Sequence, residues 1–268
     1  MIKQLLFLLS FLVSSAVYAQ IDTSQENITE AKMILKDIQS ENNFRKGSFE
    51  TKVGLMQLTA NKPASPLQLN SSDQLPFIEF DGEYMLKKKL GLGATIQHAQ
   101  NLMGTSSGTG KNSTSSYQQV FEFGPIYKYI LDETNIKNSF TVKFQYYLMR
   151  NNFKLANTQL FYANSESGLL LGCERSVPAT ELIDLVAGFD FVEVLTVKSN
   201  ESILEVNNKG TGLQLRANVY YNLEKTKRIG FGYSISAFFS KFKQPDFEGR
   251  DRHTQTYKAL SINYSTLF

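Results

Sequence analysis

The last segment of the chain alternates between two kinds of side chain and ends on an aromatic residue. One face carries small polar residues, and the other is apolar apart from a single threonine: Leu260, Ile262, Tyr264, Thr266 and Phe268. Because successive side chains of a β-strand point to opposite faces, residues 260–268 predict a strand with one apolar side. A membrane-spanning barrel and a soluble antiparallel sheet can both end in such a strand, so the rest of the chain must decide between them.

The first residues have the composition of an export signal. Lys3 precedes an apolar run over residues 5–13, and residues 17–19 supply the small side chains expected before a cleavage site. Residues 1–19 are therefore predicted to be a signal peptide, with the mature chain beginning at Gln20. The apolar run is shorter than the roughly 20 residues that cross a bilayer as a helix. No cysteine follows the cleavage site, which disfavours a lipid anchor.

The composition agrees with an exported β protein and argues against other classes. The chain has 268 residues, a net charge of +3, 20 Phe and 13 Tyr, but no Trp. Its slightly negative mean hydropathy does not exclude a membrane barrel, because polar lumen residues offset lipid-facing ones. Cys173 is the only cysteine, so an intramolecular disulfide framework is ruled out. The mild charge, without a basic stripe interleaved with aromatics, disfavours nucleic-acid binding.

From residue 48 onward the apolar residues recur with a period of two. The candidate strands are 49–58, 76–80, 84–98, 117–131, 140–148, 166–175, 183–197, 211–222, 229–240 and 260–268. They predict an all-β fold, an antiparallel up-and-down transmembrane β-barrel of about ten strands, with eight or twelve as alternatives. Asp81-Gly82, a dipeptide favoured in tight hairpins, is predicted to join the second candidate to the third. The loss of alternation around Glu193 predicts a β-bulge.

The connections between these strands alternate in length. Short connections fall at 81–83, 132–136, 176–182 and 223–227, and long ones at 59–75, 99–116, 150–165, 198–210 and 241–253. Outer-membrane barrels join their strands by short turns on the periplasmic side and by longer loops outside, whereas a soluble sandwich has no reason to obey this alternation. Residues 48–268 are therefore predicted to form a membrane barrel.

Residues 48–268 resemble the small outer-membrane β-barrel proteins of Gram-negative bacteria, broadly those of the OmpA and OmpW type. The resemblance rests on Tyr264 and Phe268 in the last strand and on the Gly230-Phe231-Gly232-Tyr233 run. No subfamily motif is present, and about ten strands depart from the eight of those barrels. The resemblance implies a monomer without cofactors in the outer membrane, surrounded by lipid and lipopolysaccharide, with both termini periplasmic. It also implies that periplasmic chaperones and the barrel-insertion machinery are partners, and that Tyr264 and Phe268 form the insertion signal.

Residues 20–47 differ from the barrel that follows, and we interpret them as a periplasmic leader. Apolar residues recur at three- and four-residue spacing: Ile28, Ala31, Ile34, Leu35 and Ile38. This spacing predicts a short amphipathic helix over residues 29–39. A short periplasmic helix is the simplest interpretation, and a plug in the barrel mouth or a docking helix for a periplasmic partner are alternatives.

Function in such a barrel depends on its lumen and its external loops. The charged residues predicted to face inward are Glu50, Lys52, Glu79, Lys87, Lys89, Glu122, Lys143 and Arg216. A barrel of ten strands is close to the size that side chains fill, so ion pairs that staple a filled lumen are one interpretation. A narrow pore or a small-ligand site is the other. Small residues would leave space opposite Arg216 and Lys143, a basic wall suited to anionic ligands: Gly230, Gly232, Ser234 and Ser236. The candidate lumen or ligand residues are Arg216, Lys143, Lys89 and Glu122.

Other functional classes have weaker support. His98 and His253 are predicted near the outer rim, but no serine nucleophile or acid pair accompanies them, so no catalytic residue is assigned. Two histidines without cysteines or clustered carboxylates also make a poor metal site. A structural or adhesion-type barrel with a filled lumen is the stronger alternative, because the external loops are long and polar. We expect first a narrow pore or a small-ligand-binding or transport protein, and a barrel hydrolase last.

Overall fold

A computed structural model of the chain describes residues 47–62, 69–87, 89–100, 116–131, 137–154, 161–199, 210–243 and 250–268. The predicted signal peptide and the predicted helix over residues 29–39 lie outside these residues. Within the described ranges, no helix has both the length and the apolarity needed to cross a bilayer.

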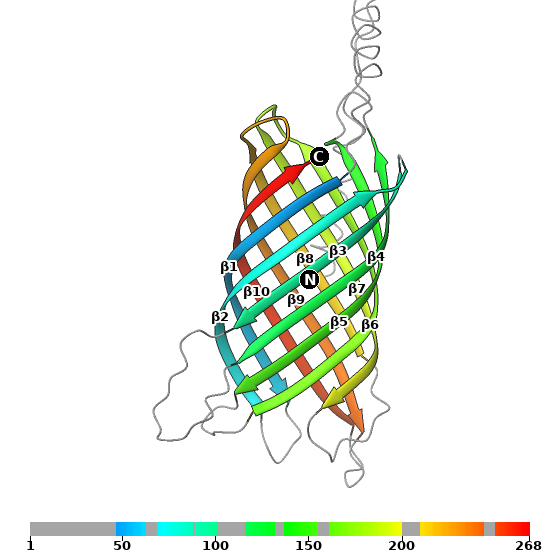
Figure 1. Cartoon of the computed structure of the whole chain (residues 1–268). Coiled ribbons are helices and arrows are strands. Elements are labelled where there is room, and N and C mark those ends of the chain that lie inside the picture. Colours follow the sequence, from blue (N-terminus) through cyan, green and yellow to red (C-terminus); the bar gives the residue numbers. More distant parts are fainter. Residues whose placement is uncertain are drawn as a thin grey trace, which may run out of the picture. The chain divides into compact units, whose positions relative to one another are not determined.

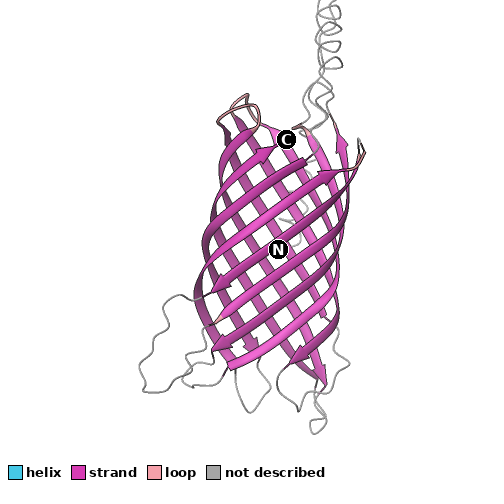
Figure 2. Ribbon diagram, viewed as in Figure 1, coloured by secondary structure: helices cyan, strands magenta, loops and turns pink. Residues whose placement is uncertain are grey.

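Ten antiparallel strands form a closed barrel, which confirms the predicted fold class (Figure 1). Each strand pairs with its neighbours in sequence, and β1 pairs with β10 to close the cylinder. Figure 2 shows the strands running obliquely around the barrel. The strands are β1 (Gly47–Lys62), β2 (Leu69–Met85), β3 (Leu90–Gln100), β4 (Tyr117–Ile130), β5 (Ser139–Lys154), β6 (Phe161–Pro178), β7 (Ile183–Ser199), β8 (Gly210–Asn222), β9 (Lys227–Lys243) and β10 (Arg250–Leu267).

The two ends of the barrel chain meet where the cylinder closes. The N–H of Phe268 donates to the carbonyl of Gly47 over 3.0 Å, and the N–H of Gly47 donates to the carbonyl of Phe268 over 2.8 Å. We call this end of the barrel the terminal rim and the opposite end the far rim. Tyr264 and Phe268 face outward, with 44% and 57% of their surface exposed. Their role as an insertion signal stays a prediction.

The predicted turn at Asp81-Gly82 is wrong, because both residues lie inside β2. Asp81 pairs with Glu50 on one side and with Thr95 on the other, and the chain turns only after Met85. The N–H of Leu86 then donates to the carbonyl of Leu90 over 2.9 Å. The carboxylate of Asp81 faces inward and binds Lys52. This ion pair and the continued ladder outweigh the local turn preference of the dipeptide.

The predicted irregularity near Glu193 is present as a β-bulge in β7. The register between β6 and β7 passes from Ser167 opposite Thr196 to Gly168 opposite Val194. Leu195 is therefore the extra residue on β7. Its insertion shifts the inward positions of β7 by one residue, which explains the broken alternation of the sequence.

The outward face carries an apolar band that begins at the terminal rim and stops short of the far rim. On β1 the apolar side chains end at Leu55, and Gln57 and Thr59 follow. Other strands also change from apolar to polar at one outward position: Gln74, His98, Gln119, Arg150, Glu193 and Lys258. Outward tyrosines edge the band near the terminal rim: Tyr84, Tyr127, Tyr129, Tyr221 and Tyr264. An apolar band with an aromatic girdle is the surface that a barrel presents to lipid.

The band predicts where an added charge destabilises the barrel. Val53 faces outward within the band, so Val53→Arg is expected to lower the free energy of unfolding by about 2–4 kcal/mol, the cost of a cation near the bilayer midplane. Thr59→Arg lies on the same strand beyond the band and should cost about 0–1 kcal/mol. Urea unfolding in phospholipid vesicles measures both. Equal losses for the two variants would contradict the position of the band.

Candidate functional site

The lumen near β1, β2 and β3 is held by a buried cluster of ion pairs. Lys52 projects inward from β1, and its Nζ lies 2.7 Å from Oε1 of Glu79 and also binds the carboxylate of Asp81. Neighbouring side chains complete the cluster, since Thr95 donates to Asp81 over 2.6 Å and Gln97 donates to Glu79 over 2.9 Å. Strand alternation explains the arrangement, because inward residues of paired strands lie side by side.

Further ion pairs cover the rest of the inner wall. Nη2 of Arg216 on β8 lies 2.6 Å from Oδ2 of Asp190 on β7. Lys143 on β5 lies 3.3 Å from Glu174 on β6. The remaining pairs are nearer the terminal rim: Lys128 with Glu83, Lys137 with Asp184, and the Tyr220 hydroxyl with Glu50. The Arg216 and Lys143 pairs join neighbouring strands, whereas the contacts of Lys128, Lys137 and Tyr220 reach past the adjacent strand. The polar contacts of the lumen therefore hold the wall both locally and across intervening strands.

An apolar layer lies in the lumen beyond this network, and buried polar side chains that include Gln255 and Glu166 lie between it and the far rim. Every strand except β8 contributes a side chain: Met56, Leu58, Leu75, Phe77, Ala99, Val120, Tyr147, Met149, Leu170, Val192, Val194, Val197, Phe238, Tyr257 and Ala259. The Phe238 ring is 5.7 Å from the Tyr147 ring and 5.8 Å from the Tyr257 ring, between centroids. On β8, a Cβ at position 212 would lie 2.4 Å from the Phe238 ring, so Gly212 makes room for it.

On β1 and β10 the apolar layer lies where the outer face has become polar, whereas around Phe238 on β9 the outer face is still apolar at Phe239. On β1, Met56 and Leu58 point inward on either side of the outward Gln57. On β10, Tyr257 and Ala259 point inward on either side of Lys258. Near the terminal rim the barrel is apolar outside and charged inside. The apolar layer follows in the lumen, and buried polar side chains lie on its far-rim side, where Asn151, Gln255 and Glu166 are hydrogen-bonded.

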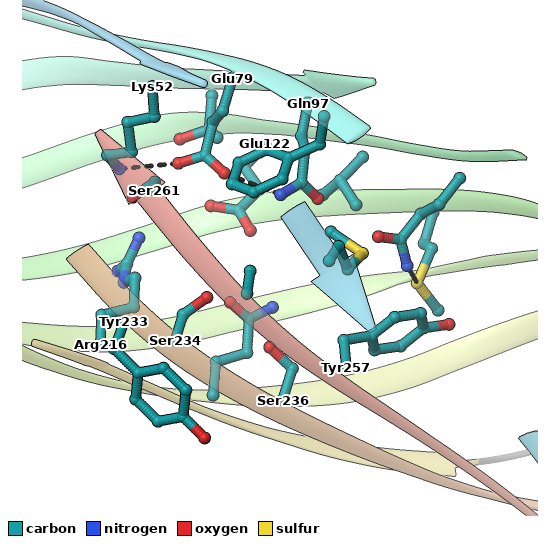
Figure 3. A pocket seen from close by; sticks show the side chains of 18 of the residues that line it. Lys52, Glu79, Gln97, Glu122, Arg216, Tyr233, Ser234, Ser236, Tyr257 and Ser261 are labelled. Carbon is teal, nitrogen blue, oxygen red and sulfur yellow. Dashed lines mark hydrogen bonds and ion pairs between the residues drawn. The ribbon is translucent and has the colours of Figure 1, made fainter. Parts of the chain in front are cut away.

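A cavity of about 70 Å³ separates the charged network from the apolar layer. Figure 3 shows Lys52, Glu79, Glu122 and Arg216 together with Ser234 and Ser236 around it. These two serines leave the space that the small residues of β9 predicted. The other small residues do not, because the Tyr220 ring packs over Gly230 and the side chains of Asn218, Ser261 and Asn263 pack over Gly232.

The structure brings three of the four candidate lumen residues into the interior. Glu122 and Arg216 line the cavity, and Lys143 lies in the inner wall with Glu174. Lys89 is placed elsewhere: it is exposed in the turn between β2 and β3, with its Nζ 5.0 Å from the Tyr129 ring centroid. The misplaced turn at Asp81-Gly82 had extended the third strand through Lys89, so the prediction of a lumen position for Lys89 is wrong. Lys87, which is also exposed beside this turn, is misplaced for the same reason.

Sequence reasoning missed several acidic members of the network. Asp81 was assigned to a turn, although Glu79, Asp81 and Glu83 are spaced by two and alternate correctly as one strand. Glu174 and Asp190 lie on strands whose inward faces mix charged, small and apolar residues, so alternation is weak there. Phe238 broke the pattern of β9 because it faces the apolar layer.

The titratable residues singled out for enzyme or metal chemistry do not gather. His98 lies on the outward face, where its ring nitrogens contact Gln119 over 3.4 Å and Gln100 over 3.2 Å. The side chain of His253 lies outside the described residues. Across the described ranges, no three His, Cys, Asp or Glu side chains are grouped so that they could hold a metal ion. Cys173 is a free cysteine.

Comparison with known proteins supports the fold and assigns no activity. No family model matches the chain, and no curated protein matches its sequence. The outer membrane protease OmpT from Escherichia coli superposes with a TM-score of 0.51 at 10% identity, over 83% of this chain and 96% of that one. Neisserial surface protein A (NspA) gives 0.39 at 9% identity, over 82% and 97%. The translocator domain of the autotransporter NalP from Neisseria meningitidis gives 0.38 at 8% identity, over 91% and 96%.

A closed antiparallel barrel with a lipid-type outer band is the fold of the bacterial outer-membrane β-barrel superfamily, and this chain has that fold. The resemblance stated from its strands and C-terminus is confirmed at this level. Identities of about a tenth show the fold alone.

The ion-pair cluster predicts a strong effect of removing its cation. Lys52→Met leaves Glu79 and Asp81 without their partner in the lumen, and breaking a buried pair in this way costs about 3–5 kcal/mol. Urea unfolding of the folded barrel measures the loss. Lys227→Met, which removes the exposed pair with Glu224 in a turn, is the matched control and should leave stability almost unchanged. A small effect of both variants would show that the cluster is dispensable.

Proposed function

We propose that the protein is a closed barrel of the bacterial outer membrane that serves as a rigid scaffold at the cell surface and holds no open pore. The apolar layer around Phe238 carries this proposal. Ions and polar solutes do not cross such a layer readily, because they would lose hydration without gaining partners. The strands also support it, since they are 11 to 18 residues long and about 9–11 suffice to cross the membrane.

In this proposal, residues 1–19 direct export, and the terminal rim faces the periplasm. The far rim then stands outside the lipid, where outward polar side chains such as Gln57 and Lys258 and the buried polar side chains of its lumen suit water. The strands end there in connecting segments of polar sequence, of which residues 101–115 are rich in Gly, Ser and Thr. Such segments on a rigid frame are suited to contacts with other molecules. Lipid and lipopolysaccharide surround the barrel, which acts as a monomer.

A narrow pore is the second candidate, favoured by the charged wall and the cavity beside it. It requires a state in which Phe238, Tyr147 and Tyr257 leave the lumen. Their stacked and edge-on contacts, together with Gly212 beneath the Phe238 ring, stabilise the closed arrangement. The OmpT likeness at 10% identity gives no ground for a protease.

Single-channel recording in planar bilayers tests the closed lumen. The refolded protein is expected to show no steady conductance. The double variant Phe238→Ala and Tyr147→Ala removes two rings from the layer, so it should admit water and produce measurable conductance steps. Phe239→Ala changes the adjacent, outward-facing ring and should stay silent. Steady conductance of the unaltered protein would overturn the closed scaffold in favour of the pore.

A further inference from the structure

One carboxylate in the cavity is left unpaired by the ion-pair network. Glu122 of β4 is 4% exposed and lines the cavity. Within the part of the chain that the structure describes, its side chain makes no hydrogen bond and no ion pair. In Figure 3 it lies beside Glu79, which by contrast is bound by Lys52 and Gln97. An ionised carboxylate buried without a partner is costly, so another group must neutralise it.

The cations of the lumen are already committed to other acids. Arg216 pairs with Asp190, Lys143 with Glu174, and Lys52 with both Glu79 and Asp81. Acidic side chains outnumber basic ones in this part of the lumen, because Lys52 alone serves two carboxylates. Arg216 and Lys143 attract the Glu122 carboxylate electrostatically, but neither forms an ion pair with it, so the site lacks a directly bound positive partner among the described residues. Lys52 and Arg216 also line the cavity, but each is held in an ion pair, so Glu122 is the lining charge without an ion-pair partner.

The cavity wall across from β4 supplies polar groups that lack partners. Gln214 of β8 and Ser234 and Ser236 of β9 line the cavity, and none of their side chains is hydrogen-bonded among the described residues. They present two hydroxyl oxygens and an amide oxygen to the same space as the Glu122 carboxylate. Neutral and anionic oxygen atoms are the ligands of hard cations, and they also accept hydrogen bonds from ammonium groups.

The size and the charge of the cavity limit the occupant. A volume of about 70 Å³ holds a few water molecules or one small ion with part of its hydration shell, since a single water needs roughly 10–15 Å³ on this measure. One unpaired carboxylate balances one positive charge. Aromatic side chains on the far-rim side, Tyr147, Phe238 and Tyr257, also favour a monovalent cation over an apolar molecule.

We propose that this cavity binds a small monovalent cation, an alkali-metal ion or a small ammonium ion, paired with Glu122 and ligated by oxygen atoms of Gln214, Ser234 and Ser236. Cation binding at this site is a property beyond the proposed scaffold role. The bound cation completes the charge balance of the lumen and couples the stability of the barrel to the ions around it. This proposal about cation binding holds whether the lumen is open or closed.

The test compares thermal unfolding midpoints of the full-length mature protein, refolded separately in potassium chloride, ammonium chloride and tetraethylammonium chloride. The last salt provides equal ionic strength with a cation too large for the cavity. A ligand that binds only the folded state raises its stability with the logarithm of concentration above the dissociation constant. We expect potassium, ammonium or both to raise the midpoint above that in tetraethylammonium, and the comparison of the two identifies the class of ion.

Glu122→Gln keeps the shape of the side chain and removes its charge, so the cation-dependent shift should disappear. Glu83→Gln is the matched control. It removes a lumen carboxylate that pairs with Lys128 away from the cavity, and the shift should persist. If Glu122→Gln does not fold, Ser236→Val fills the same cavity without changing charge and should also abolish the shift. Equal midpoints of the unaltered protein in all three salts would overturn the proposal and leave a proton or ordered water to neutralise Glu122. A shift that survives both Glu122→Gln and Ser236→Val would also overturn it.

Discussion

The lipid around the barrel determines where each kind of side chain can lie. Because lipid offers no hydrogen bonds, every strand must find a partner on both edges, and β1 and β10 close the cylinder through Gly47 and Phe268. The same lipid makes apolar side chains favourable on the outer wall and confines charge to the lumen. On β1 the outer wall turns polar beyond Leu55, and the inward side chains there, Met56 and Leu58, join the apolar layer of the lumen.

Charges in the lumen follow from this confinement. Inward residues of paired strands lie side by side. Lys52 therefore contacts the acids of the next strand, Glu79 and Asp81, as a direct result of the pairing of β1 with β2. The attraction within each ion pair offsets part of the free energy lost when two charges leave water. Removing one charge of a pair leaves its partner buried and uncompensated. Between these pairs and the Phe238 layer lies a polar cavity that neither fills, and Glu122 opens onto it.

Much of the fold could be predicted from the sequence, and so could some of the residues that face the lumen. Alternation located all ten strands, and the disturbance near Glu193 located the bulge. Three of the four candidate lumen residues, Arg216, Lys143 and Glu122, do lie inside. Lys89 was misplaced because a local turn preference at Asp81-Gly82 was trusted over the continuing alternation of β2. The strength of a dipeptide's preference is small beside that of a buried ion pair, and the pair is invisible until β1 and β2 are in register.

The sequence by itself determined the side of the wall on which most residues lie, because a strand has a period of two whatever its partners are. It also determined closure, through the alternating connections and the apolar final strand. The proposal that the lumen is closed rests on the tertiary structure alone. Phe238 and Tyr257 lie on the paired strands β9 and β10, but Tyr147 comes from β5 and meets Phe238 only across the closed barrel. Which acids the lumen cations neutralise, and that Glu122 is left over, likewise depend on distances that no single strand encodes.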